Sequence, residues 1–122
     1  MKLRSLAVLA ASLLISAAAF AHEAKGPNGG RMVDAGPNHV EMVIKDRSVV
    51  VFVTDSADKP VTTAGYKGVA ILTVSGKPQR IALEPQDGAR LAGTAAVPLP
   101  LNARGVVQVT GPDGKTAQGR FQ

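Results

Sequence analysis

Apolar and polar residues alternate along the chain from position 39 onward. In the first such run, Val40, Met42 and Ile44 share one face of an extended chain, while His39 and Glu41 share the other. A period of two is typical of a β-strand with one buried face. We therefore expect Met42 to pack in the core and the face of His39 and Glu41 to be exposed.

Similar short apolar runs follow at intervals of about ten residues, as in all-β domains. They cover 48–54, 69–75, 79–84, 90–97, 106–110 and 116–121, and turn formers such as Asp113-Gly114 separate them. Nothing after residue 21 keeps a helical period over three turns. The pattern predicts an all-β domain, an immunoglobulin-like β-sandwich of about seven short antiparallel strands. A small barrel is the alternative that the pattern does not separate from it.

The first 21 residues have the three parts of a secretory signal peptide. Lys2 and Arg4 supply positive charge, an apolar stretch covers 6–15, and Ala19-Phe20-Ala21 has the small residues of a signal-peptidase cleavage site. We expect cleavage after Ala21 and a periplasmic protein that begins at His22. The apolar stretch is shorter than the roughly 20 residues that span a bilayer, so we expect no membrane anchor after cleavage.

Residues 22–38 are rich in glycine and proline. Gly26-Pro27-Asn28-Gly29-Gly30 and Ala35-Gly36-Pro37-Asn38 both contain strong turn formers. We expect an irregular arm with at most a short strand over 31–34. The predicted organisation is a signal peptide over 1–21, the arm over 22–38 and a β-sandwich domain over 39–122.

Composition excludes two broad classes of function. Loss of Lys2 and Arg4 lowers the formal charge from +5 to +3, and the remaining basic residues are spread along the chain. With few aromatic residues beside them, these charges do not form a nucleic-acid-binding stripe. The chain has no cysteine, no phosphate-binding glycine loop and no nucleophile motif, so we do not expect an enzyme.

The remaining candidate chemistry is metal binding near the new N-terminus. The α-amine and imidazole of His22 could chelate one ion together, which suits copper(II). His39 and Glu41 point to the same face of a strand, roughly 6.6 to 7 Å apart at the backbone. If the arm folds back along that strand, Glu23 or Asp34 could join them. Nitrogen and carboxylate ligands suit copper or zinc.

A metal-free function is the alternative from a different class. A periplasmic β domain can act as a protein-interaction module, with an exposed strand edge or an apolar patch docking on a partner. The sequence shows neither the partner nor the oligomeric state.

The motifs of the arm and the first strand also resemble a known group. His22-Glu23-Ala24-Lys25 with the following Gly-Pro-Asn-Gly-Gly, then His39-Val40-Glu41, resembles small periplasmic proteins and N-terminal segments of heavy-metal efflux adaptor subunits. These carry a His-Gly-Gly element before a His-x-Glu strand and a later Asp-x-x-x-Lys-Pro-Val turn, here Asp55 to Val61. The resemblance implies metal export or resistance, with an envelope metal efflux complex as partner. Asn28 stands where that group often has histidine.

Overall fold

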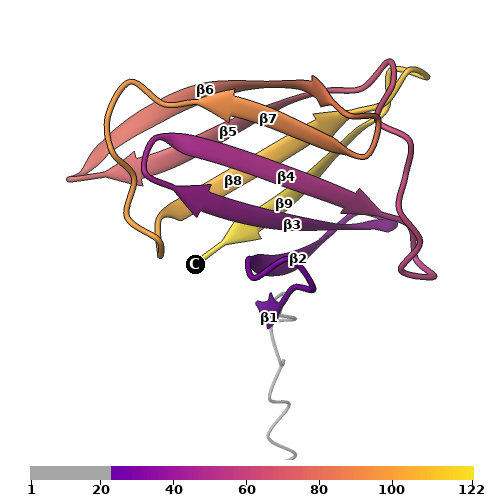
Figure 1. The fold of residues 1–122 in the computed structure, drawn as a ribbon, viewed down its shortest axis with the longest axis horizontal. Helices are drawn as coiled ribbons and strands as arrows, with labels where there is room; N and C mark the ends of the chain where they lie inside the picture. Colours follow the sequence, from indigo (N-terminus) through magenta and orange to yellow (C-terminus); the bar gives the residue numbers. More distant parts are fainter. Residues whose placement is uncertain (1–22) are drawn as a thin grey trace, which may run out of the picture.

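The computed structural model describes residues 23–122, which form nine β-strands (Figure 1). The strands are β1 (Ala24–Lys25), β2 (Arg31–Ala35), β3 (Asn38–Lys45), β4 (Ser48–Thr54), β5 (Lys67–Val74), β6 (Lys77–Gln86), β7 (Arg90–Thr94), β8 (Arg104–Thr110) and β9 (Thr116–Phe121). In this part of the chain, no helix is long and apolar enough to cross a membrane. The expected signal peptide and His22 lie outside the described residues.

All nine strands belong to one antiparallel sheet in the order β1-β2-β3-β4-β7-β6-β5-β8-β9. The sheet curls strongly, so that β9 at one end packs against β2 near the other (Figure 1). Gly119 of β9 marks this contact, since a Cβ there would lie 2.8 Å from side-chain carbons of Val33 and Val40. The approach of the two ends therefore depends on a residue without a side chain.

The prediction of an all-β antiparallel fold is confirmed, but the two-sheet sandwich is wrong. β7 pairs with β4 on one side and with β6 on the other, so hydrogen bonding continues where a sandwich would divide into two sheets. The result is one half-barrel sheet. Alternating apolar residues look the same in both architectures, because each buries one face of every strand.

The interior of the curl holds the hydrophobic core. Val40, Met42 and Ile44 are buried there, which confirms the face predicted for the first strand. Side chains from the other end of the sheet complete this core, including Leu72, Val107 and Phe121. A single sheet has no second layer to cover its apolar face, so curling is what removes that face from water.

The β2–β3 hairpin brings part of the expected arm into the sheet. β2 corresponds to the short strand expected over 31–34, and its register sets Asp34 opposite His39 and Met32 opposite Glu41. β4 lies on the other side of β3 and sets Thr54 opposite His39. Residues directly opposite on antiparallel strands share a face, so this register places Asp34, His39 and Thr54 together on the outside of the curl.

Candidate functional site

His39 lies on the outer face of β3, with a carboxylate beside each of its ring nitrogens. Nε2 is 3.0 Å from Oδ1 of Asp34, its cross-strand neighbour on β2. Nδ1 is 3.1 Å from Oδ1 of Asp58, which belongs to the turn after β4. The His39 side chain is 29% exposed, whereas those of Asp34 and Asp58 are 71% and 74% exposed. An imidazole thus lies between two solvent-accessible acids.

The two ring nitrogens of His39 have different surroundings. Nδ1 is buried and its short contact with Asp58 is not a well-aligned hydrogen bond, so it counts among the unpartnered buried polar atoms of the described residues. Nε2 lies beside Asp34, whose side chain is largely exposed. An ion bound between Nε2 and Asp34 would therefore meet a carboxylate that solvent reaches.

The turn that carries Asp58 is organised by Asp55. One carboxylate oxygen of Asp55 accepts hydrogen bonds from the backbone N–H of Ala57 at 2.8 Å and of Lys59 at 3.0 Å. The hydrogen bond from Lys59 is the main reason that the pKa of Asp55 is lowered from its ordinary value, with desolvation opposing it in part. Asp58 has a positive φ of 61°, a conformation that aspartate tolerates better than most residues. The position of Asp58 is thus set by local hydrogen bonds.

Glu41 shares the outer face with His39 but has a different environment. Its carboxylate accepts three hydrogen bonds: from the backbone N–H of Asn28 at 2.9 Å, from the side-chain amide of Asn28 at 2.8 Å and from the backbone N–H of Gly30 at 2.8 Å. Glu41 is only 2% exposed. The expectation of an exposed face was wrong here, because the turn from Gly26 to Gly30 folds over the carboxylate.

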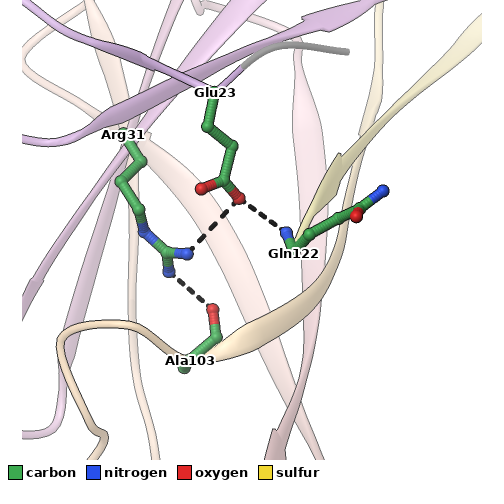
Figure 2. Close-up of polar contacts among 4 residues, drawn as sticks. All are labelled: Glu23, Arg31, Ala103 and Gln122. Carbon is green, nitrogen blue, oxygen red and sulfur yellow. Dashed lines mark hydrogen bonds and ion pairs between the residues drawn. The ribbon is translucent and has the colours of Figure 1, made fainter. Parts of the chain in front are cut away.

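Glu23 lies among the residues that join the two ends of the described chain, as Figure 2 shows. Its Oε1 accepts a hydrogen bond from the backbone N–H of Gln122 at 2.5 Å and lies 3.5 Å from Nη1 of Arg31. The other terminal nitrogen of Arg31 donates to the carbonyl oxygen of Ala103. These contacts tie β2 to the C-terminal strand, and Asp34 and His39 take no part in them.

Of the five residues predicted as metal ligands, the structure brings two together. Asp34 and His39 are in contact, Glu41 and Glu23 make other contacts, and His22 lies outside the described residues. Within 23–122, no three or more His, Cys, Asp or Glu side chains are grouped so that they could hold a metal ion. The described residues therefore offer a two-ligand site, Nε2 of His39 and the carboxylate of Asp34.

Asp58 is the neighbour of His39 that sequence analysis missed. It stands 19 positions away from His39, inside the turn from Asp55 to Val61. The Asp-x-x-x-Lys-Pro-Val motif of this turn does not indicate a contact with the imidazole. The pairing of His39 with Thr54 is what brings the beginning of that turn alongside the imidazole. The turn starts at the residue after Thr54, so a correct prediction of the β3–β4 register would have placed the turn, and with it Asp58, near His39.

Comparison with known proteins gives no match: no protein-family model, curated protein or solved structure matches the chain. The resemblance to segments of metal efflux adaptors stays a prediction.

Proposed function

We propose that this protein binds a divalent transition-metal ion, copper or zinc, through Asp34 and His39. In this proposal the protein acts in the periplasm as a weak carrier or buffer near a metal efflux system. The main support is the separation of 3.0 Å between Nε2 of His39 and Oδ1 of Asp34 at an accessible position. An imidazole nitrogen with a carboxylate oxygen is a ligand pair that both metals accept.

The spacing of the pair suits a shared ion. In a tetrahedral zinc site with bonds of roughly 2.0 to 2.1 Å, neighbouring ligand atoms are about 3.3 Å apart. The observed separation is 3.0 Å, so an ion could enter with a displacement of a few tenths of an ångström. Both ligands stand on paired strands, which hold their backbones in register. Two ligands make a site of low affinity, as a buffer or carrier requires.

We propose His22 as the third ligand, through its imidazole and, after cleavage following Ala21, its α-amine. The support comes from the sequence, since His22 stands two positions before β1 and would be the first residue of the processed chain. Its imidazole and a free α-amine would then supply two nitrogen ligands from one residue. A five- or six-membered chelate at an N-terminal histidine favours copper(II) in particular.

Metal titration of an untagged chain that begins at His22 tests this function. Calorimetry with copper(II) and zinc(II) should show saturable binding of one ion. His39→Ala should abolish it, and His22→Ala and Asp34→Asn should each weaken it by about ten-fold or more, the effect of losing one favourable ligand interaction. Glu84→Gln is the matched control, since Glu84 is an exposed acid on another strand. The proposal fails if His39→Ala binds either metal as the parent chain does.

The proposed export is tested separately. N-terminal sequencing of the protein recovered from the periplasm should give His22 as the first residue. A different first residue would remove the α-amine chelate while leaving the Asp34 and His39 pair in place.

A metal-free interaction module is the second candidate, supported by an open strand edge. β2 pairs with residues 38–42 of β3. Residues 43–45 of β3 pair with β4 on one side and have no described strand partner on the other. A groove of about 320 Å³ opens there, and Leu101, 74% exposed, forms part of its wall. Such an edge could take an extended partner segment as an added strand. Partner binding that persists in chelator and is lost in Leu101→Lys would favour this candidate.

A further inference from the structure

We infer that Asp58 is a positioning residue that keeps a proton on Nδ1 of His39 and so makes Nε2 the metal-binding nitrogen. This inference rests on the proposed function and assigns a role to a residue outside the predicted ligand set. Asp58 does not bind the ion in this scheme. It acts on the ion only through the imidazole.

The first support is the contact between Asp58 and Nδ1. Their 3.1 Å separation and the burial of Nδ1 place a carboxylate directly against a nitrogen that solvent does not reach. A carboxylate accepts hydrogen bonds, and a neutral imidazole carries one N–H. The favourable arrangement puts that N–H on Nδ1, facing Asp58. The structure shows this as a close contact and not as an aligned hydrogen bond, and in this scheme the bond forms when Nε2 binds the ion.

The second support is what this tautomer does on the other side of the ring. With the N–H on Nδ1, Nε2 presents only its lone pair, and Oδ1 of Asp34 lies 3.0 Å away. Two hydrogen-bond acceptors at that distance repel each other unless a proton or a metal cation lies between them. A divalent ion removes this repulsion by binding both atoms. The pair of acids around His39 thereby divides into a ligand, Asp34, and an orienting group, Asp58.

The third support is that Asp58 is held in place independently of His39. The turn that carries Asp58 is closed by a backbone hydrogen bond of 2.9 Å from Asp55 N–H to the carbonyl of Lys59 and by another of 3.0 Å from Asp58 N–H to the carbonyl of Asp55. A bridge between Thr54 and Pro60 holds the base of the turn next to β4. Metal-binding histidines commonly donate their second N–H to a carboxylate in this way, and loss of that partner costs 10 to 100-fold in metal affinity.

Zinc titration of the chain beginning at His22, combined with nitrogen-15 NMR of the His39 ring, tests the inference. In the zinc-loaded parent chain, the ring should carry its proton on Nδ1 and the metal on Nε2. Asp58→Asn keeps a residue that tolerates positive φ but removes the charge, and it should weaken zinc binding by about ten-fold or more. Its amide spectrum should remain that of the folded parent.

Asp87→Asn is the matched control, since Asp87 is also a turn aspartate with positive φ, and it should leave zinc affinity unchanged. If the parent chain does not bind zinc, the proposed function itself fails. If the parent binds zinc but Asp58→Asn binds it equally well, or if the ring carries its proton on Nε2, then only the role of Asp58 is overturned.

Discussion

Glu41 fills the space that a side chain at Gly26 would need. A Cβ built on Gly26 would lie 2.1 Å from Cδ of Glu41, well inside the closest approach of two carbon atoms. The backbone of the arm therefore passes directly over a buried carboxylate and donates N–H groups to it from Asn28 and Gly30. A carboxylate removed from water needs such donors, and the turn supplies them without a basic side chain.

Replacing Glu41 by alanine should loosen this turn and destabilise the protein. Three hydrogen bonds to a charged acceptor are lost, and we expect a fall of about 2 to 3 kcal/mol in the free energy of unfolding. Urea unfolding of Glu41→Ala measures it, with exposed Glu84→Ala as the control. Equal stability of the two variants would show that the turn does not depend on the carboxylate.

Gly26→Ala should also destabilise the protein, and its effect should depend on Glu41. The added methyl group meets the Glu41 side chain, so overpacking should cost about 1 to 3 kcal/mol in a chain with Glu41. In a Glu41→Ala background the obstructing atoms are absent, and the same change should cost much less. A double-mutant cycle by urea unfolding measures this coupling. Strictly additive effects would contradict the close approach of the two residues.

The fold was predictable as far as local patterns determine it. Alternation placed Met42 in the core and predicted antiparallel strands, because burial of one strand face leaves a period of two. Whether the faces close as two layers or one curled sheet depends on pairings between distant strands, such as β4 with β7. No local pattern encodes that choice.

The site was predictable where it depends on a single hairpin. Asp34 and His39 flank a Gly-Pro-Asn turn, so their pairing follows from local register. The burial of Glu41 depends on the turn from Gly26 to Gly30, which folds over the outer face of β3 and which the sequence analysis did not predict. Asp58 reaches His39 only through the β3–β4 register, and no side-chain pattern marks that contact.

Arg31 should contribute to the closure between the first and last strands. Its guanidinium lies 5.4 Å from the centroid of the Phe121 ring. It also donates a hydrogen bond to the Ala103 carbonyl and lies close to the Glu23 carboxylate (Figure 2). Arg31→Ala should therefore lower the free energy of unfolding by about 1 to 2 kcal/mol. Urea unfolding provides the measurement. Arg120→Ala on the exposed side of β9 should change it by less than about 0.5 kcal/mol.

Acid should weaken the turn that carries Asp58. Hydrogen bonds from Lys59 and Ala57 hold the folded pKa of Asp55 below its ordinary value of 3.8. A lowered pKa means that Asp55 stabilises the fold above its unfolded-state pKa, and that this contribution disappears as the pH falls through the folded-state pKa. The stability difference between the parent and Asp55→Asn should accordingly shrink on acidification. Urea unfolding at neutral and acidic pH measures it, and a difference that does not vary with pH would contradict this role.

Binding of a metal by Asp34 and His39 is tested most directly by locating the ion. Crystals of the chain beginning at His22, grown with zinc and measured at the zinc absorption edge, should show one anomalous peak on the outer face of the β2–β3 hairpin. The peak should lie about 2.0 to 2.1 Å from Nε2 of His39 and at a similar distance from a carboxylate oxygen of Asp34. A zinc peak only at other residues, or no peak at saturating zinc, would contradict the proposed site.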